Sequence, residues 1–383
     1  MKKILALTGI RSDYDLLSNL YRKINEDRDF ELKFLVSGAH LSQTYGHTVD
    51  LIEKDGFEIL LKIETLIDSD SKSGRLKTTA ILLQTSIDIV KQYNPDLIIY
   101  AGDREEVIVG SMLGTFLGIP TAHFFGGEYT ASGHIDNQLR YAAAKMSSIS
   151  FVSTEEQKCR LKKMGEAEER IFCIGDPSLD KFLIEEYVDM NIVFKKLKVN
   201  PMKKYALVIY HAMDESNKYT SCFENILTIL KEKDIPAFIS YPNTDPGNRK
   251  IIDVIEKYKN VDKFYFYKNL ERNTFINIYR NAYFQIGNSS AGIVESASLH
   301  IPVIDVGDRQ KGRLSSGNVI NSKIDHQSIK ESIEKAISKE FIKNCRKINN
   351  IYGDGRSSEK ALKLLKKLEY KKYLLKMEDP YEF

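Results

Sequence analysis

Ile4-Leu5-Ala6-Leu7 is an uninterrupted apolar run that leads into the polar turn Thr8-Gly9-Ile10-Arg11-Ser12-Asp13-Tyr14. The run predicts a strand over residues 3–7 that is buried on both faces, as in a parallel sheet. The spacing of apolar residues after the glycine turn predicts a helix over residues 16–24. A strand, a turn and a helix in this order indicate the first repeat of an α/β fold.

The same alternation continues along most of the chain. Strands are predicted at residues 30–36, 56–61, 97–100, 120–125, 149–153, 171–175, 205–210, 237–240, 261–267, 283–287 and 301–306. Helices are predicted at residues 49–55, 77–92, 107–117 and 155–164, with an amphipathic closing helix packed across both domains at 357–377. Strands alternating with helices indicate parallel sheets covered by helices on both faces.

The length of the chain predicts two domains. Its 383 residues exceed what one hydrophobic core usually organises. The alternation also starts afresh in the second half of the chain. We therefore expect a Rossmann-like domain over residues 1–175, a second over residues 176–365, and a helical tail over residues 366–383.

Composition narrows the classes of partner. The formal net charge is +3, which gives no basic patch strong enough to predict a nucleic-acid partner. The apolar run near the N-terminus is too short for a signal peptide, and no stretch approaches the length of a membrane span. Four scattered cysteines without C-x-x-C spacing indicate neither a zinc site nor a disulfide framework, so a reducing cytoplasm is expected.

Seven polar clusters follow predicted strands. Ligands of open parallel sheets bind outside the carboxyl ends of the strands, so these clusters are expected to line one cleft between the two domains. The clusters are residues 9–14, Gly102-Asp103-Arg104, Gly126-Gly127-Glu128, His211, Pro242-Asn243-Thr244-Asp245, Gly287-Asn288-Ser289-Ser290-Ala291-Gly292 and Gly307-Asp308-Arg309-Gln310.

The cluster from Gly287 to Gly292 has the chemistry of a diphosphate site. Free N–H groups at a helix start, with the hydroxyls of Ser289 and Ser290, can bind phosphate oxygens, and glycine permits close approach. Glu295, on the first turns of that helix, can accept hydrogen bonds from ribose hydroxyls. The plain alternative is a helix cap with small residues for tight packing.

Two arginines follow the next predicted strand. Arg309 and Arg313 can neutralise phosphates through paired N–H bonds, although surface ion pairing is an equally simple role. Asp103 ends an apolar strand, where partial desolvation would suit a working acid or base. His211 ends another strand, although a histidine in such a place is more often structural. Neither a Walker lysine motif nor Gly-x-Gly-x-x-Gly occurs, which argues against an NTPase or an NAD enzyme.

Read together and in order, the motifs resemble a known family. They are Thr8-Gly9-Ile10-Arg11-Ser12-Asp13-Tyr14, Ser37-Gly38-Ala39-His40-Leu41, Gly102-Asp103-Arg104, His123-Phe124-Phe125-Gly126-Gly127-Glu128, Ile135-Asp136 with Arg140, Tyr241-Pro242-Asn243-Thr244-Asp245-Pro246-Gly247, Gly287-Asn288-Ser289-Ser290, Gly307-Asp308-Arg309-Gln310-Lys311-Gly312-Arg313 and Tyr352-Gly353-Asp354-Gly355. The chain resembles the UDP-N-acetylglucosamine 2-epimerases, in particular the hydrolysing branch of sialic acid synthesis and its relatives in legionaminic acid synthesis.

The resemblance implies the GT-B fold, in which two Rossmann-like domains close on a nucleotide sugar. It also implies a homodimer and a reaction without cofactor or metal. The residues expected to bind the UDP moiety are Arg11, Arg104, Asn243, Ser289, Ser290, Gly292, Glu295, Arg309 and Arg313. The residues expected to act on the sugar are Asp103, Asp136, Glu128, His211 and Arg140.

The family reaction gives these residues a chemical purpose. A base removes the proton on carbon 2 while the anomeric C–O bond breaks, which releases UDP and leaves a 2-acetamidoglucal. Water then adds across the double bond to give the manno product, N-acetylmannosamine in the case of UDP-N-acetylglucosamine. Carboxylates would supply the base, and the serines, helix start and arginines would stabilise the departing diphosphate.

Two departures from the family pattern concern the sugar end. Phe125 stands where relatives often have a catalytic glutamate, so Asp136 or Asp103, and after them Glu128, are the candidate proton carriers. The family's Asp-Asp-x-x-Arg-His stretch also reads Asp136-Asn137-Gln138-Leu139-Arg140-Tyr141 here. Both changes suggest an altered sugar pocket, such as one for a deoxy or diacetamido sugar.

Several functions therefore stay open at this point. The first is hydrolysing 2-epimerisation of UDP-N-acetylglucosamine, and its variant is the same reaction on a UDP-2,4-diacetamido-trideoxyhexose. Non-hydrolysing epimerisation and sugar transfer to an acceptor use the same architecture. A nucleotide-sugar-binding protein without catalysis is a fourth reading, motivated by Phe125.

Overall fold

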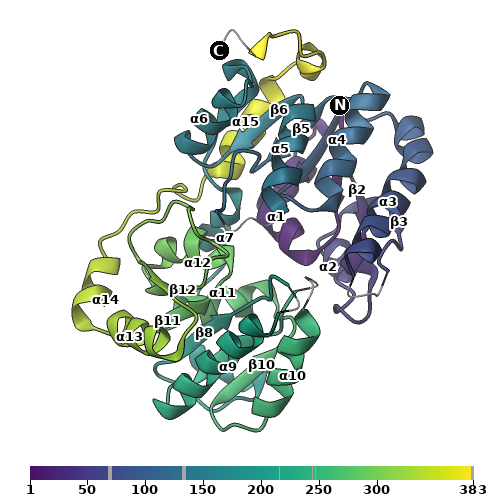
Figure 1. Ribbon diagram of the computed structural model, residues 1–383. Coiled ribbons are helices and arrows are strands. Elements are labelled where there is room, and N and C mark those ends of the chain that lie inside the picture. The colour runs from purple at the N-terminus through teal and green to yellow at the C-terminus, as the bar shows by residue number, and fades with distance from the viewer. Residues whose placement is uncertain (68–70, 132–134, 215, 244, 246, 381–383) are drawn as a thin grey trace. The chain divides into compact units, whose positions relative to one another are not determined.

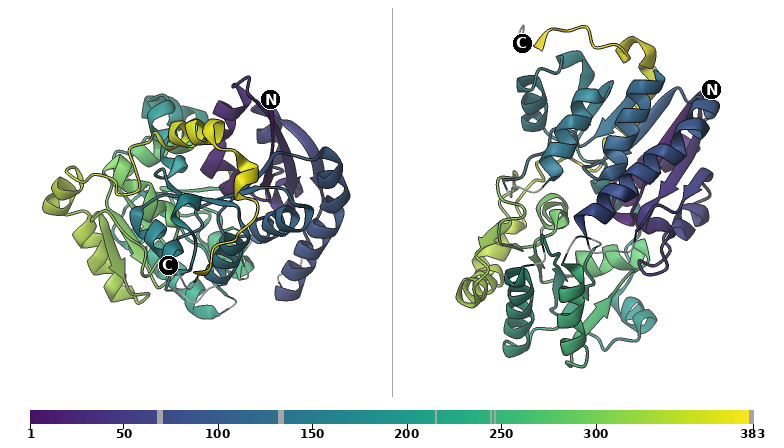
Figure 2. Two further views of the ribbon diagram at one scale, coloured as in Figure 1. Left: turned by 90° about the horizontal axis from the view of Figure 1, so that it is seen from above. Right: turned by 45° about the vertical axis from the view of Figure 1, so that its right-hand side comes forward.

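The computed structural model describes the chain except for residues 68–70, 132–134, 215, 244, 246 and 381–383 (Figure 1). Its internal contacts divide it into two compact units. The first unit comprises Met1–Tyr129, Ile135–Lys181 and Tyr352–Phe383, and the second comprises Thr130–His134 and Phe182–Ile351. Each unit contains one sheet with helices packed against it (Figures 1 and 2).

The first unit is built on a seven-stranded sheet with the order β3-β2-β1-β4-β5-β6-β7, in which neighbouring strands pair in parallel. The strands are β1 (Lys2–Thr8), β2 (Phe30–Ser37), β3 (Glu58–Ile63), β4 (Leu97–Ala101), β5 (Thr121–Phe124), β6 (Ile149–Val152) and β7 (Ile171–Cys173). The helices are α1 (Arg11–Asn25), α2 (Val49–Lys54), α3 (Lys72–Tyr93), α4 (Glu105–Leu117), α5 (Asp136–Met146), α6 (Glu155–Lys163) and α15 (Ser357–Lys367).

Alternate residues of β1 point into two separate cores. Ile4 and Ala6 pack with α1, α2 and α15, whereas Leu5 and Leu7 pack with α3, α4 and α5 on the other face. This arrangement explains the continuous apolar run, because both faces of the strand are covered by helices. The sequence prediction of a parallel sheet buried on both faces is confirmed.

The second unit repeats the design with a six-stranded parallel sheet of order β10-β9-β8-β11-β12-β13. The strands are β8 (Ala206–Ile209), β9 (Ala237–Ser240), β10 (Phe264–Tyr267), β11 (Phe284–Gly287), β12 (Val303–Val306) and β13 (Val319–Ser322). The helices are α7 (Lys181–Ile184) at the junction, then α8 (Met190–Leu197), α9 (Asn217–Glu232), α10 (Asn248–Tyr258), α11 (Arg272–Arg280), α12 (Ser290–Val294), α13 (His326–Ala336) and α14 (Lys339–Cys345).

The unit boundaries differ from those expected from the sequence. The first unit continues to Lys181 rather than residue 175, and the chain returns to it at Tyr352 rather than staying in the second domain to residue 365. The return is fixed by Asp180, whose two carboxylate oxygens accept hydrogen bonds from the backbone N–H groups of Ser357 and Ser358 at 3.0 and 2.7 Å. These bonds satisfy the start of α15, and they link residues too distant in sequence for local patterns to reveal.

The closing helix is shorter than the predicted one over residues 357–377. It ends at Lys367 because Leu368 is extended. The ammonium of Lys2 donates hydrogen bonds to the carbonyls at this end, those of Leu365, Lys366 and Leu368, at 2.9, 2.9 and 3.0 Å. The helix packs on α1 of the first unit. The prediction also missed β13, a four-residue edge strand whose side chains are only alternately buried and so leave no apolar run.

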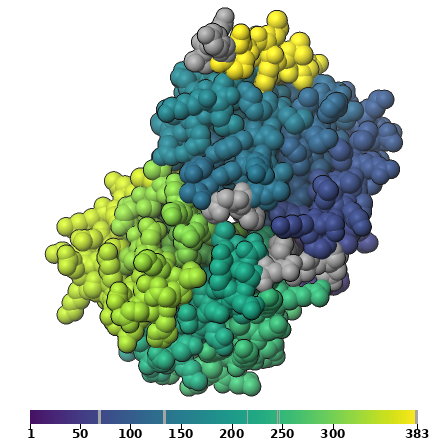
Figure 3. Space-filling model, viewed as in Figure 1, coloured from purple at the N-terminus to yellow at the C-terminus, as the bar shows by residue number. Residues whose placement is uncertain are grey.

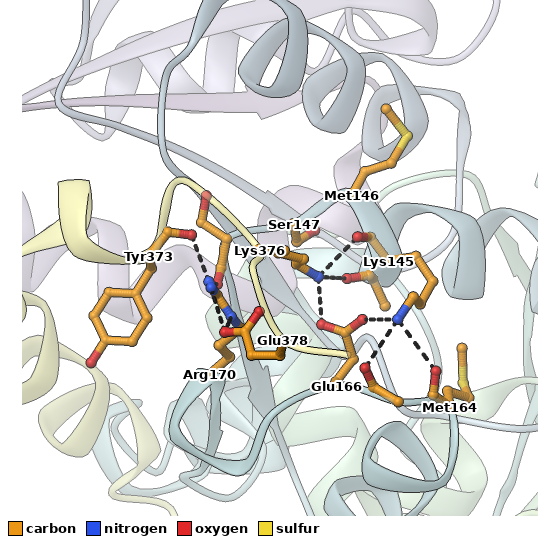
Figure 4. Close-up of polar contacts among 12 residues, drawn as sticks. Lys145, Met146, Ser147, Met164, Glu166, Arg170, Tyr373, Lys376 and Glu378 are labelled. Carbon is orange, nitrogen blue, oxygen red and sulfur yellow. Dashed lines mark hydrogen bonds and ion pairs between the residues drawn. The ribbon is translucent and has the colours of Figure 1, made fainter. Parts of the chain in front are cut away.

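The segment after α15, at the yellow end of the colour scale in Figure 3, is held on the first unit by ionic contacts, which Figure 4 shows. Lys376 donates to the carbonyls of Ala144 and Lys145, at 3.3 and 2.8 Å, and pairs with the buried carboxylate of Glu166. Glu166 pairs in turn with Lys145 at 2.7 Å. Burial lowers the pKa of Lys376, and the charge of Glu166 opposes this shift.

Arg170 makes the second half of this fastening. Its guanidinium donates to the carbonyls of Ser148, Tyr373 and Leu375 at 3.1, 2.6 and 2.7 Å, and to Glu378 at 2.7 Å (Figure 4). The carbonyls of Ala144 and Lys145 belong to the last turn of α5, so Lys376 satisfies the end of that helix. The predicted tail over residues 366–383 is thus an integrated part of the first unit up to the last described residue.

We expect Lys376→Met to lower the free energy of unfolding by about 1–3 kcal/mol, because it leaves the Glu166 carboxylate buried with only one cation. Lys372→Met is the matched control, since Lys372 lies in the same segment but pairs with Glu369 on the surface. That control should change stability by less than about 0.5 kcal/mol. Chemical denaturation measures both, and equal losses would contradict a special role for Lys376.

A search of the described helices finds none that is long and apolar enough to cross a membrane.

Candidate functional site

Each sheet reverses its strand order at one point. In the first unit the reversal lies between β1 and β4, and in the second it lies between β8 and β11. In open α/β sheets the carboxyl ends of the two strands at this point flank the ligand crevice. The turns after these four strands begin at Gly9, Gly102, Tyr210 and Asn288, so four of the seven polar clusters found in the sequence fall at the two reversal points.

In the second unit, Asn288 joins the two turns. Its side chain accepts from the His211 N–H at 2.8 Å and donates to the His211 carbonyl at 2.7 Å. The ring Nδ1 of His211 accepts from the Asn243 N–H at 3.2 Å. An accepting Nδ1 fixes the neutral tautomer with its proton on Nε2, so His211 is held as a hydrogen-bond donor at this edge.

Arg309 is anchored next to these residues. Its guanidinium donates to the Asn288 carbonyl at 3.2 Å and lies 3.5 Å from a carboxylate oxygen of Asp245, which also accepts from the Asn243 side chain at 2.7 Å. Gln310 donates to the same Asn288 carbonyl at 2.8 Å. The structure therefore brings together His211, Asn243 and Arg309. Residues Thr244 and Pro246 of the same motif lie outside the described part of the chain.

Ser289 and Ser290 start α12, directly after the turn at Asn288. The Ser289 hydroxyl accepts from the Ala291 N–H at 3.4 Å as the helix cap. Gly292 faces the sheet, where an added Cβ would lie 3.0 Å from both Gln285 and Val303. The glycine is therefore needed for packing of α12 on its sheet, a reason different from the close ligand approach expected from the sequence.

Glu295 and Arg313 complete the predicted nucleotide end. Glu295 is buried and ends α12, and Arg313 donates its backbone N–H to the Gln310 carbonyl at 3.1 Å. Asp305 on β12 was not anticipated. Burial raises its pKa to about 7 against the opposing charges of Arg309 and Arg313, so its carboxyl gains or loses a proton near neutrality.

In the first unit, Arg140 contacts two of the residues that are expected to act on the sugar. Its side chain is fully buried and pairs with the Asp103 carboxylate. The same guanidinium donates to the Asn137 side chain at 3.1 Å and to the Glu128 carbonyl at 3.3 Å. Asp136 is the first residue of α5, one helical turn before Arg140. Asp103, Asn137 and the Glu128 carbonyl thus meet at the Arg140 guanidinium, and the action of Asp103, Asp136, Glu128 and Arg140 on a sugar stays a prediction.

His123 stabilises the turn that carries Asp103. Its Nε2 donates to the Gly102 carbonyl at 2.9 Å, and burial lowers its pKa to about 4, so the ring is neutral. Gly102 has a φ of +88°, and its N–H donates to the Phe124 carbonyl at 3.0 Å. The ring and the glycine together fix the turn that presents Asp103. His123 therefore has a structural role here.

Phe125 has a left-handed backbone with a φ of +70°, which is rare for a bulky residue. Its side chain is buried in the apolar core that includes Ile4 and Phe34. Phe125 therefore contributes apolar packing at a position with an unusual backbone. The ring cannot carry a proton, so the proton carriers must be found among the other acids.

Sequence reasoning missed two adjacent acids at the start of α4. Glu105 pairs with Arg75 and lies 3.9 Å from Arg104. Burial alone would raise the pKa of Glu105, but the two guanidiniums outweigh it and the pKa is lowered. Glu105 is therefore ionised. The two adjacent acids after Arg104 are visible in the sequence. Their different charges are not, because Arg75, the partner of Glu105, lies thirty residues earlier in the chain.

Glu106 behaves in the opposite way. Burial, together with the negative charges of Glu105 and Asp13, raises the pKa of Glu106 to about 8. The Glu106 side chain packs against Gly9 at the reversal point of the sheet, since a Cβ added to Gly9 would lie 1.7 Å from the Glu106 Oε1. The same carboxyl accepts a hydrogen bond from the Ser37 hydroxyl at 3.4 Å. Glu106 is a neutral acid packed beneath the turns that follow β1 and β2.

The turn after β1 is held by its own hydrogen bonds. Asp13 accepts from the Thr8 hydroxyl at 2.8 Å and from the N–H groups of Gly9 and Ile10 at 3.1 and 3.2 Å. These bonds start α1 earlier than the predicted residue 16. Arg11, the predicted diphosphate ligand, is on the first turn and pairs with Asp15 at 3.2 Å.

The arrangement can do two kinds of chemistry. The second unit presents a neutral histidine, hydroxyls and anchored arginines, which suit an anionic leaving group. The first unit presents carboxylates with one buried guanidinium, which suit proton transfer on a polar substrate. Among the described residues, no cluster of three or more His, Cys, Asp or Glu side chains could hold a metal ion.

Comparison with known proteins identifies the family. The family model described as UDP-N-acetylglucosamine 2-epimerase matches residues 22–366. The chain belongs to the UDP-N-acetylglucosamine 2-epimerase family. The resemblance seen in the sequence motifs is confirmed, and the chain is a nucleotide-sugar 2-epimerase of this family.

Two relatives refine the comparison. The UDP-N,N'-diacetylbacillosamine 2-epimerase (hydrolyzing) of Legionella pneumophila is 33% identical over 367 residues, which cover 96% of each chain. The GDP/UDP-N,N'-diacetylbacillosamine 2-epimerase (hydrolyzing) of Campylobacter jejuni is 35% identical over 354 residues, covering 90% of this chain and 89% of the relative.

Solved structures confirm the fold of the epimerase family. The UDP-GlcNAc 2-epimerase of Methanocaldococcus jannaschii, solved in complex with UDP-GlcNAc and UDP, matches with a TM-score of 0.81 at 19% identity. The match covers 96% of this chain and 99% of that chain. The expected architecture of two Rossmann-like domains of the GT-B type is therefore correct.

Proposed function

We propose that the protein is a hydrolysing 2-epimerase that acts on UDP-N,N'-diacetylbacillosamine, a diacetamido-trideoxy sugar nucleotide. The observation that carries this proposal is the 33% identity to the Legionella pneumophila enzyme of that name along 96% of both chains. Phe125 supports it, because loss of the family acid fits an altered sugar end. This order reverses the expectation from the sequence, which placed UDP-N-acetylglucosamine first and the diacetamido sugar second.

In the proposed reaction one nucleotide sugar uses both groups of residues. The UDP end binds at Arg309, Ser289 and Ser290 of the second unit, with Arg11, Arg104, Asn243, Gly292, Glu295 and Arg313 as further predicted contacts. The sugar end binds at Asp103, Asp136, Glu128, Arg140 and His211. The assignments are supported by the positions of Asp103, which follows β4 and pairs with Arg140, and of Ser289, which follows β11, at the reversal points of the two sheets.

The chemistry follows from these groups. A carboxylate of the first unit takes the proton from carbon 2, and the electron pair forms the C1–C2 double bond as the C1–O bond to UDP breaks. The positive charge of Arg309 and the hydroxyls stabilise the departing diphosphate. Water then adds its hydroxyl to carbon 1, and a proton reaches carbon 2 from the opposite face. The family resemblance further supports a homodimer that acts in the cytoplasm.

A substrate panel tests the proposal. Incubation with UDP-N,N'-diacetylbacillosamine, UDP-N-acetylglucosamine and a GDP-linked analogue, followed by NMR, should show a free 2-epimerised diacetamido sugar with stoichiometric UDP. Faster turnover of UDP-N-acetylglucosamine would overturn the choice of sugar. An epimerised sugar still attached to UDP would overturn hydrolysis, and product formation only with an added acceptor would indicate a transferase.

Arg309→Ala should weaken UDP binding by about 10- to 100-fold, because it removes a charge-assisted contact from a guanidinium already held in place by Asn288 and Asp245. Calorimetry measures the change. Lys311→Ala is the control, since Lys311 is in the same loop but its side chain is 67% exposed. A loss of affinity in the lysine variant equal to that in the arginine variant would refute a specific role for Arg309.

A further inference from the structure

The segment that follows β5 packs directly against the start of α6. A Cβ added to Gly127 would lie 2.4 Å from the carbonyl oxygen of Gln157, which is on the first turn of α6. A Cβ added to Gly126 would lie 2.9 Å from the Nδ1 of His123. A larger residue at either position would therefore push the segment away from its supports. The next residue along the segment is Glu128, which is expected to act on the sugar.

Arg160 on α6 contacts the residues on both sides of Glu128. Its guanidinium donates a hydrogen bond to the Gly127 carbonyl at 2.6 Å and lies 5.4 Å from the centroid of the Tyr129 ring. The same guanidinium pairs with Glu156, one helical turn earlier. A guanidinium with a hydrogen bond, a ring contact and an ion pair has little freedom to move. Arg160 therefore gives the segment a fixed point of attachment.

Hydrogen bonds hold both peptide groups that flank the Glu128 Cα. The preceding peptide is held at the Gly127 carbonyl by Arg160, and its N–H donates to the Phe125 carbonyl at 3.4 Å. The following peptide is held at the Glu128 carbonyl by the buried guanidinium of Arg140 at 3.3 Å. Peptide groups are planar, so fixing two of them fixes φ and ψ of the residue between them. Arg160 and Arg140 therefore set the direction in which the Glu128 side chain leaves the backbone.

We propose that Arg160 is a positioning residue that holds Glu128 in the direction required for its action on the sugar. This inference rests on the proposed function, in which Glu128 is one of the sugar-end residues. The Gly127 contact is made to the backbone, so Arg160 acts through Glu128. A shift of about 1 Å in a reacting group can lower turnover about 100-fold, because proton transfer demands closer alignment than binding does. The loss of Arg160 is therefore expected to appear in kcat.

Arg160→Met should lower kcat about 10- to 100-fold and change KM by less than about threefold. The variant keeps the length of the side chain but loses the hydrogen bond to the Gly127 carbonyl. Arg160→Lys should recover part of the lost turnover, because its ammonium can donate to that carbonyl. Release of UDP from UDP-N,N'-diacetylbacillosamine measures both. A lysine variant as impaired as the methionine variant would show that the carbonyl contact is not what matters, and would overturn the proposal.

Two further variants on α6 separate positioning from helix stability. Lys158→Met is the matched control, since Lys158 is on the same helix and pairs with Glu168 at 2.8 Å. Its kcat and KM should stay within about twofold of wild type. Glu156→Gln removes the ion pair of Arg160 but keeps the donor to Gly127, so kcat should fall by less than about threefold. A loss in Lys158→Met equal to that in Arg160→Met would assign the effect to α6 as a whole and refute the proposal.

Amide hydrogen exchange, followed by mass spectrometry, tests the same contact without substrate. The Glu128 N–H should exchange about tenfold faster in Arg160→Met than in the wild type, and Lys158→Met should leave it unchanged. Unchanged exchange in Arg160→Met would show that Arg160 does not hold the segment. Faster exchange with unchanged kcat would show that the direction of Glu128 does not matter. Either result overturns the proposal. If the wild type turns over no nucleotide sugar but exchange rises in Arg160→Met, the proposed function fails and the attachment by Arg160 stands.

Discussion

Asp103→Asn is expected to lower kcat about 100- to 10,000-fold while UDP affinity changes by less than about threefold. The amide cannot accept the carbon-2 proton, but it keeps the size of the carboxylate and one acceptor oxygen for the buried Arg140. UDP affinity should persist because most of the expected UDP ligands, Ser289, Ser290 and Arg309 among them, belong to the other unit. Stopped-time NMR measures turnover and calorimetry measures UDP binding.

Asp136→Asn is the comparison for this experiment. Both acids are candidates for the proton carrier: Asp103 pairs with Arg140, and Asp136 begins α5 one turn before Arg140. A large loss of turnover in Asp136→Asn with near-normal turnover in Asp103→Asn would reverse their roles. Loss of UDP binding in Asp103→Asn would point instead to a damaged fold. Thermal unfolding separates that case, because an unpaired buried guanidinium is costly.

Glu106→Gln is expected to stabilise the protein at alkaline pH and to change little at acid pH. The folded pKa is about 8 and the unfolded value is near 4.5, so the folded state holds a proton that the unfolded state loses over that interval. Stability of the wild type therefore falls as the pH rises from 4.5 to about 8 and stays low above it. The amide of the Gln variant cannot ionise, so the variant does not lose this stability. We expect the difference in the free energy of unfolding to be about 2–4 kcal/mol.

Unfolding in denaturant at about pH 5 and about pH 9 tests the expectation. Asp13, Glu105, Arg104 and His40 titrate or carry charge near Glu106, but they are present in both proteins and cancel in the comparison. Glu53→Gln is the control, because Glu53 pairs with Lys62 on the surface of the same unit. A variant equally or less stable than wild type at the higher pH would show that Glu106 is ionised in the folded protein.

Much of the fold followed from short-range patterns. Strands such as β1 and β4 are buried on both faces, so their apolar runs could be recognised without knowledge of their neighbours. The edge strand β13 was missed because it alternates buried and exposed residues over only four positions. The end of α15 was misplaced because a side chain from the opposite end of the chain, Lys2, satisfies its last carbonyls.

The site was predictable to the extent that its residues follow strands. Asp103, His211 and Asn243 were predicted as site residues in this way, and the structure joins His211 with Asn243 through a hydrogen bond. Glu105 is ionised and Glu106 is protonated, and this difference could not be predicted from the sequence, where two glutamates simply stand side by side. It depends on Arg75 reaching one carboxylate while the other packs beneath Gly9, and both contacts arise only in the folded chain.

The return of the chain to the first unit has a consequence for biosynthesis. Residues 182–351 form a nearly contiguous unit that can fold as soon as it leaves the ribosome, whereas the first unit waits for α15 to be translated. During that wait the side of α1 that receives α15 is bare. Premature termination after residue 351 would therefore leave the early-made unit with an uncovered apolar surface, and aggregation of the nascent product would begin there.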